Sequence, residues 1–233
     1  MRFSMTYRVA LMLVGAASCH QHHFQHRTDQ APIGELTLSI NGVSFETRAH
    51  WMRQANLALG DSCPFAAFGS VIVNHTANPG VGELVCTGAN SHSRTGNPTL
   101  HGEMAAISNC SSILADPNGP YSLSPSEALA AFTDLSLYTN AESCPMCASA
   151  IRWAGFKEYV YGSSIDKLVE KGWAQIHVWS LEIFQQSLDL PNPGHLIGGV
   201  LTNETDPYFS WQFDAAYPCP KGCSRVDGSC TAQ

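Results

Sequence analysis

The chain has 233 residues, of which 44% are hydrophobic and 13% are charged, a balance typical of a globular protein that can bury a sizeable core. The formal net charge is −7, and the 12 lysines and arginines are scattered along the sequence. Because binding to nucleic-acid phosphates depends on clustered Lys and Arg, this composition argues against a long nucleic acid as the partner.

The first residues have the features of a secretory signal. Arg2 and Arg8 precede a short apolar run at 9–14, and small residues follow at 15–18. The run is shorter than the roughly 20 apolar residues that span a bilayer, and no later stretch resembles a membrane span. We therefore expect residues 1–18 to be a signal peptide and the mature protein to be secreted, with no membrane contact after cleavage. An uncleaved interfacial anchor is the alternative.

Asparagine triplets agree with export. Those that begin at Asn74, Asn109 and Asn203 fit the glycosylation acceptor pattern, which matters only in a eukaryotic host. Each triplet is a weak signal by itself, since such patterns arise by chance.

The cysteines are a stronger indication. Cys19 lies at the suspected cleavage point, and Cys144 and Cys147 are assigned to a metal below. Six others remain, enough for three disulfides in an oxidising compartment: Cys63, Cys86, Cys110, Cys219, Cys223 and Cys230. The sequence does not choose among the pairings. It predicts at least one disulfide within the C-terminal tail, whereas Cys86 and Cys110 lie in apolar segments and fit buried free thiols equally well.

Residues 19–44 are predicted to be a mobile polar leader, and their four histidines fit a solvated tail better than a metal site. Apolar residues at roughly helical spacing predict a helix over 45–59, which Gly60 and Asp61 end. Two β-rich runs follow, at 70–74 and 83–87. The turn sequence at 78–80 separates them, so the pattern predicts a hairpin.

The second half of the chain alternates between helical and β-rich segments. Helices are predicted at 102–115 and 145–154, the second with Pro145 near its start, where a missing N–H costs nothing. Strands are predicted at 135–139 and 159–162, and an amphipathic element at 173–184. The alternation predicts an α/β sheet covered by helices. We place the main domain at 45–190 and a cysteine-bearing C-terminal extension at 191–233.

Two short motifs predict a metal site. His101 and Glu103 are two residues apart at the start of one predicted helix, and Cys144 and Cys147 are three apart at the start of another. Spacing of three places both sulfurs on one face of a helical turn, and the helix N-terminus favours thiolates. Because zinc accepts a mixed set of imidazole and thiolate ligands, we predict a Zn²⁺ site at His101, Cys144 and Cys147.

Glu103 gives this site a catalytic character. Three protein ligands leave a fourth position for water, and zinc lowers the pKa of that water to roughly 7. A carboxylate two residues from a ligand is suited to carry a proton from the water to a leaving amine. Taken alone, the cysteine pair also fits a disulfide or a redox pair. Glu103 taken alone also fits a solvated charge on a helix. The two motifs together favour catalytic zinc.

Together the motifs resemble the H-x-E and P-C-x-x-C signature of zinc nucleobase deaminases, which belong to the cytidine deaminase-like superfamily. The similarity covers roughly 67–163 and is greatest to bacterial guanine deaminases and tRNA adenosine deaminases. The chain departs from the signature at Ser143, where Pro is usual, and at Gly102, where Ala is more usual. We expect the loss of the Pro to loosen the loop slightly, with little effect on metal binding.

The resemblance implies a three-layer α/β/α fold with a central mixed five-stranded sheet, zinc as cofactor, and frequent homodimers. It implies hydrolytic release of ammonia from a nucleobase, nucleoside or related aminated heterocycle, with a guanine-type purine favoured over other purine or pyrimidine substrates. By the same similarity Asn90 contacts the substrate, although a turn residue is the alternative. Ser70 and Trp153 are further candidate contacts. Phe68 and Trp153 could stack on a base, but we favour core positions for both.

Other functions stay open. The chain could be a secreted, zinc-binding but non-enzymatic or toxin-like relative, although a structural zinc has no use for Glu103. Among enzymes, a tRNA adenosine or cytosine deaminase is the alternative, because the zinc chemistry is the same. Export and the acidic balance weigh against tRNA.

Overall fold

The computed structural model describes residues 39–61, 63–77 and 80–233. The predicted signal segment 1–18 and most of the predicted leader, with its histidines, lie outside these residues. Among the described residues, no helix has both the length and the apolar character needed to cross a membrane.

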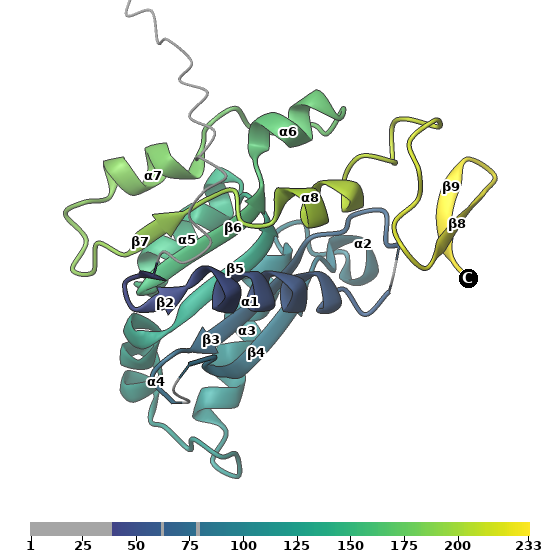
Figure 1. The fold of residues 1–233 in the computed structure, drawn as a ribbon. Coiled ribbons are helices and arrows are strands. Elements are labelled where there is room, and N and C mark those ends of the chain that lie inside the picture. Colours follow the sequence, from purple (N-terminus) through teal and green to yellow (C-terminus); the bar gives the residue numbers. More distant parts are fainter. Residues whose placement is uncertain (1–38, 62, 78–79) are drawn as a thin grey trace, which may run out of the picture. The chain divides into compact units, whose positions relative to one another are not determined.

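A mixed five-stranded sheet forms the centre of the fold, with the strand order β4-β3-β5-β6-β7 (Figure 1). Strand β3 is antiparallel to β4 and β5, whereas β5, β6 and β7 are parallel. The strands are β3 (Gly69–Asn74), β4 (Glu83–Ala89), β5 (Ser136–Ala141), β6 (Glu158–Ser163) and β7 (His195–Ile197). The predicted α/β fold with a mixed five-stranded sheet is confirmed.

Helices cover both faces of this sheet (Figure 1). They are α1 (Phe45–Leu57), α2 (His92–Thr95), α3 (Gly102–Ala115), α4 (Pro125–Ala131), α5 (Pro145–Ala154), α6 (Ile165–Glu170), α7 (Ser180–Gln186) and α8 (Thr202–Thr205), with 3₁₀ turns η1 (Phe132–Asp134) and η2 (Asp206–Tyr208). Side chains alternate along a strand, so Val71 packs with Trp51 of α1 while its neighbour Ile72 packs with Ala106 of α3. The two cores therefore lie on opposite faces of the sheet.

Helix α3 approaches the sheet unusually closely. A Cβ added to Gly88 of β4 would collide with the backbone of Ala106, and one added to Gly102 would lie 2.6 Å from the carbonyl oxygen of Phe68. Both glycines therefore let α3 settle against β3 and β4. This contact holds the first turn of α3, with His101 and Glu103, beside the edge of the sheet.

The predicted helices at 45–59, 102–115 and 145–154 and the hairpin of β3 and β4 are confirmed, within two residues at each helix end. The amphipathic prediction at 173–184 is wrong in its first half, because α7 begins only at Ser180. The segment at 173–176 instead lines a cavity. Apolar side chains there face a ligand site rather than a helix interface.

The predicted domain boundaries differ from the structure at both ends. Residues 39–44, assigned to the mobile leader, form a hairpin of β1 (Ser39–Ile40) and β2 (Val43–Ser44), and Asn41 of its turn donates to Glu158 Oε1 at 2.8 Å. Strand β7 lies beyond residue 190 yet pairs with β6. The extension therefore completes the central sheet instead of standing apart from it.

Among the described residues, three disulfides join the six cysteines other than Cys144 and Cys147: Cys63–Cys223, Cys86–Cys110 and Cys219–Cys230. The bond between Cys86 and Cys110 ties β4 to α3, so the alternative of buried free thiols is wrong. The predicted tail disulfide is the one between Cys219 and Cys230. It encloses part of the hairpin of β8 (Cys223–Val226) and β9 (Ser229–Ala232).

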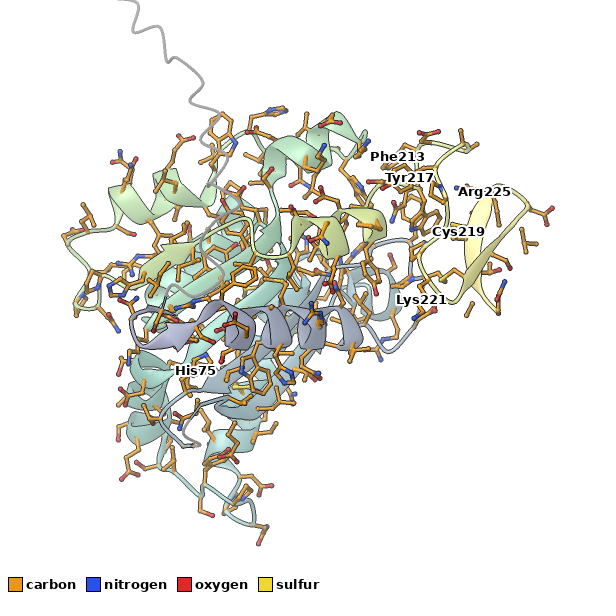
Figure 2. The ribbon with its side chains drawn as sticks, in the orientation of Figure 1. His75, Phe213, Tyr217, Cys219, Lys221 and Arg225 are labelled. Carbon is orange, nitrogen blue, oxygen red and sulfur yellow. A yellow bond between two sulfur atoms is a disulfide. The ribbon has the colours of Figure 1, made fainter. Side chains whose placement is uncertain are left out.

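The C-terminal hairpin is held by polar contacts as well. Figure 2 shows Tyr217, Cys219 and Arg225 around it, and Arg225 Nη2 donates to the carbonyl oxygen of Tyr217 at 2.6 Å. The disulfide to Cys63 joins this hairpin covalently to the segment before β3. The residues that follow Cys63, at 64–66, line a cavity.

Candidate metal centre and substrate cavity

The three predicted zinc ligands lie together where two helices begin. His101 is the N-cap residue of α3, Cys144 is the N-cap residue of α5, and Cys147 lies in the first turn of α5. Their ligand atoms all lie within 4.8 Å of one another. His101 Nδ1 is 3.6 Å from Cys144 Sγ and 3.7 Å from Cys147 Sγ. Ordinary zinc bond lengths at a tetrahedral ion place such atoms about 3.6 Å apart, so the donor set fits zinc.

The loop before Cys144 is firmly held despite its departure from the signature. The N–H of Ser143, which a proline would lack, donates to Tyr159 Oη at 2.7 Å, and Ser180 Oγ donates to the Ser143 carbonyl at 3.0 Å. Ser143 is fully buried. Where a Pro is usual, the loop is therefore held by two hydrogen bonds, one of them to a hydroxyl of β6.

Glu142 fixes the same loop from its other side. Its carboxylate accepts from the backbone N–H of Ile165 and from that of Ser180, both at 2.9 Å. These are the first residues of α6 and α7, where helices leave N–H groups without intrahelical partners. One buried carboxylate thus joins the metal loop to the starts of two helices.

Glu103 is 5% exposed and lines the same cavity as His101 and Cys144. Burial raises the pKa of its carboxyl above the ordinary value. The pKa of Cys144 is lowered to about 4, first by a hydrogen bond with Cys147 and then by one with His101. The pKa of Cys147 is raised by the same hydrogen bond and by burial. Binding of a metal to both sulfurs requires the Cys147 proton to leave.

A cavity of about 520 Å³ opens over the metal ligands. Phe68 and Trp173 form its aromatic walls, with ring centroids 5.3 Å apart, and Trp173 Nε1 donates to the Phe209 carbonyl at 2.8 Å. The cavity is lined by Ala66, Phe68, Asn90, His92, His101, Glu103, Glu142, Cys144, Trp173, Ala174, Gln175 and Ile176. Apolar walls with a few polar groups suit a small planar ligand.

The structure brings only one of the three predicted substrate contacts to this cavity. Asn90 lines it, just after the end of β4. Ser70 is fully buried, and its Oγ has no hydrogen-bond partner in the described part of the chain. Trp153 is 78% exposed and lies outside the set of lining residues, because the buried face of α5 carries Cys147 and Ile151 instead.

Core positions were favoured for both aromatic candidates, and the structure places the two differently. Trp153 is exposed, so that expectation is wrong. Phe68 is half-buried: it packs against the fully buried Phe209, as expected of a core position, and it also lines the cavity. Trp173, His92 and Glu142 also line the cavity and were not predicted from the sequence. An Asn followed two residues later by a His after a strand end was a usable signal for His92, whereas no local pattern connects Trp173 with the metal motifs.

Comparison with known proteins places the chain in a family. Residues 45–163, just over half of the chain, match the cytidine and deoxycytidylate deaminase zinc-binding region. The guanine deaminase of Bacillus subtilis (strain 168) is 29% identical over 173 residues, which cover 74% of this chain and 95% of that protein.

Solved structures with a similar fold include deaminases of two kinds. A guanine deaminase from Nitrosomonas europaea has a TM-score of 0.48 and 16% identity, covering 74% of this chain and 84% of that one. A tRNA:A34 deaminase has a TM-score of 0.47 and 22% identity, covering 68% of this chain and 98% of that one. From the match to the family and the site described above, the chain belongs to the cytidine and deoxycytidylate deaminase zinc-binding family and is a zinc-dependent hydrolytic deaminase.

Proposed function

We propose that the substrate is a guanine-type purine, whose amino group the enzyme releases as ammonia. The observation that carries this proposal is the convergence of His101, Cys144 and Cys147 beside the buried Glu103, in a cavity walled by aromatic rings. The similarity to the Bacillus guanine deaminase, over 95% of that protein, supports the choice of purine.

Each residue of the site has its own role in this reaction. Zinc held by the three ligands supplies Lewis-acid activation of water. Glu103 takes a proton from the attacking water and delivers one to the departing amine, so that water and the C–NH₂ group become C=O and ammonia. Phe68 and Trp173 meet edge to face, with an interplanar angle of 80°, so the planar ring can stack on one of them and meet the edge of the other. Asn90 orients the ring by a hydrogen bond.

The proposal is tested by measuring ammonia release from guanine, guanosine, adenine and cytosine. We expect the native enzyme to convert guanine fastest. Glu103→Gln keeps the size of the side chain but cannot take up the proton, so it should retain zinc and lose at least about 100-fold in kcat. Equal rates for the two proteins would contradict the role of Glu103. No ammonia from any heterocycle would contradict the proposed function.

We also propose that the mature protein is secreted after removal of residues 1–18. Three disulfides support this location, because such bonds persist in oxidising compartments. Asn109 and Asn203 are both exposed, so in a eukaryotic host both are candidate glycosylation acceptors. N-terminal sequencing and mass spectrometry of protein from the culture medium test both points. An intact Met1 on purely intracellular protein would contradict export.

A homodimer is the assembly that we propose. The exposure of Trp153, at 78%, supports it, since large aromatic side chains are enriched at interfaces. Light scattering of the native protein should give the mass of two chains, and Trp153→Lys should shift it toward one. A monomer at micromolar concentration would contradict the proposal.

A further inference from the structure

His92 lies beside the metal centre but is not among the three grouped ligands. It is the first residue of α2, it lines the substrate cavity, and its ring centroid is 6.5 Å from that of His101. A second cavity of about 600 Å³ is lined by His92 and Asn90 as well. The two side chains therefore line both cavities.

The amide of Asn90 has one defined orientation. Its Oδ1 accepts from the backbone N–H of His92 at 3.1 Å, and it lies 2.6 Å from His92 Nδ1. A backbone N–H only donates, so the amide atom at this position must be the oxygen. His92 Nδ1 must then carry a proton and donate it to the same oxygen.

The other ring nitrogen of His92 agrees with this assignment. Ser93 Oγ lies 2.9 Å from His92 Nε2. With the proton of the neutral ring on Nδ1, Nε2 is an acceptor, and the Ser93 hydroxyl donates to it. A hydroxyl can also accept, so the Ser93 contact is compatible with this tautomer, and the contact with Asn90 is the one that selects it.

This arrangement leaves the NH₂ group of Asn90 for the ligand. Within the described part of the chain, no hydrogen bond involves Asn90 Nδ2, and the residue lines both cavities. An amide NH₂ donates and cannot accept. A group that meets it must be a carbonyl oxygen or an unprotonated ring nitrogen, and guanine offers both kinds in O6, N3 and N7.

We propose that His92 is a positioning residue that holds the Asn90 amide with its NH₂ group toward the cavity, so that the site selects heterocycles presenting a hydrogen-bond acceptor to Asn90. This inference rests on the proposed function, because it concerns the same substrate. It adds a residue that does not touch the reacting atoms and acts through Asn90.

A matched pair of variants tests the role of the ring donor. Asn places an NH₂ near the position of Nδ1, whereas Leu has nearly the shape of Asn and no donor. We expect His92→Leu to raise KM for guanine about tenfold, with kcat changed by less than about threefold, and His92→Asn to restore KM. His195→Leu is the control, because it removes an Nδ1 contact to the Lys157 carbonyl outside the cavity. Equal KM values for the Leu and Asn variants would overturn the inference.

Coupling to Asn90 distinguishes positioning from a general structural effect. If His92 acts through the Asn90 amide, Asn90→Ala combined with His92→Leu should be no worse than Asn90→Ala alone. Zinc content measured on every variant shows whether His101 is disturbed. If the two substitutions raise KM additively, or if His92→Leu loses zinc, the role of His92 as a positioning residue is contradicted.

Base analogues test the selection of an acceptor. 2-Aminopurine lacks O6, 3-deazaguanine lacks N3 and 7-deazaguanine lacks N7. With the analogue that lacks the atom meeting Asn90, the native enzyme and His92→Leu should have the same KM. A tenfold difference with all three analogues would overturn the selection of an acceptor by Asn90.

The tautomer of His92 gives a reading that does not depend on activity. Two-bond ¹H–¹⁵N spectra of histidine-labelled protein, assigned with His92→Asn, should show a protonated Nδ1 and an unprotonated Nε2 at high pH. If the enzyme is active and the proton lies on Nε2 instead, the proposed role of His92 is overturned. Ammonia release from no heterocycle would instead overturn the proposed function, and the tautomer would still decide the orientation of the amide.

Discussion

Tyr159 holds the metal loop at the position where the chain differs from its family signature. It is fully buried, its hydroxyl accepts from the Ser143 N–H, and its ring lies 5.7 Å from that of Phe184. Tyr159→Phe keeps the ring and leaves a buried N–H without a partner, so we expect a loss of about 1–3 kcal/mol in the free energy of unfolding and weaker zinc binding. Urea unfolding and chelator competition measure the two effects.

The control for this variant is Tyr161→Phe. Tyr161 is half-buried on the same strand, and its hydroxyl makes no hydrogen bond to any described residue. Tyr161→Phe should leave the free energy of unfolding and the zinc affinity nearly unchanged. Equal zinc affinities for the native protein and Tyr159→Phe would show that the hydroxyl does not hold the loop.

A buried ion pair between Arg48 and Glu158 makes stability depend on pH. Their side chains are 3% and 1% exposed, and Arg48 donates to both oxygens of Glu158 at 2.9 and 3.0 Å. Burial acts to raise the pKa of Glu158, but the hydrogen bonds from Arg48 and Asn41 and the charge of Arg48 outweigh it and lower the pKa. The stabilisation is therefore complete above the unfolded pKa of about 4.3 and is lost as the pH falls through the lower folded value.

Glu158→Gln leaves the Arg48 charge buried without a counterion, so it should cost about 3–5 kcal/mol at neutral pH. The difference from the native protein should narrow as the pH falls below about 4.3. Urea unfolding between neutral and acid pH measures both. The control is Glu204→Gln, which breaks the exposed pair with Arg53 and should cost much less. A pH-independent difference for Glu158→Gln would contradict the ion-pair account.

At this scale the sequence predicted what depends on local spacing. His101, Cys144 and Cys147 were predicted as one set from their motifs, and each stands at or near the start of a helix that the sequence also predicted. Trp153 was misjudged because its exposure depends on which face of α5 meets the rest of the fold. Trp173 was missed because long-range folding alone brings it to the cavity.

At the scale of elements, the disulfide between Cys63 and Cys223 joins the C-terminal hairpin to the segment before β3. It closes a loop with a sequence separation of 160, against 11 for Cys219–Cys230. By loop entropy, replacing Cys63 and Cys223 together by Ser should cost up to about 5 kcal/mol, and replacing the shorter-loop pair about 3 kcal/mol.

The two cysteine pairs should also differ in their effect on the site. Pro64, Phe65 and Ala66 follow Cys63 directly and line the second cavity, so loss of the longer-range disulfide should raise KM for the substrate, while loss of Cys219–Cys230 should not. Thermal unfolding and steady-state kinetics measure the pair of variants. Equal KM values for the two variants would show that the Cys63–Cys223 disulfide does not shape the cavity.

Some elements resisted prediction for physical reasons. The helices α3 and α5 have start signals and continuous lengths of 14 and 10 residues, whereas β7 has only 3. A three-residue parallel strand is defined by its pairing with β6 rather than by its own pattern. The same holds for β1 and β2, which depend on the turn at Asn41 and Gly42 with positive φ values of 53° and 79°.

At the scale of the whole molecule, the alternation of strands and helices predicted the fold class, and the family resemblance supplied the mixed five-stranded sheet. The pairing of cysteines was beyond reach, because Cys63 and Cys223 meet only after the chain has folded. The substrate cavity was equally beyond reach as a shape. It is assembled from the segment before β3, the segments that follow β4 and β5, the start of α3, and the stretch after α6.

The central claim is that one imidazole and two thiolates of this chain hold a single zinc ion. Zinc K-edge X-ray absorption, combined with metal analysis of the purified protein, tests it most directly. We predict one zinc per chain, with two sulfur ligands at about 2.3 Å and the remaining ligands nitrogen or oxygen at about 2.0–2.1 Å, and one fewer sulfur or no zinc in Cys144→Ser. Protein that folds without zinc after growth in zinc-replete medium, or a disulfide between Cys144 and Cys147 in the active protein, would contradict the account.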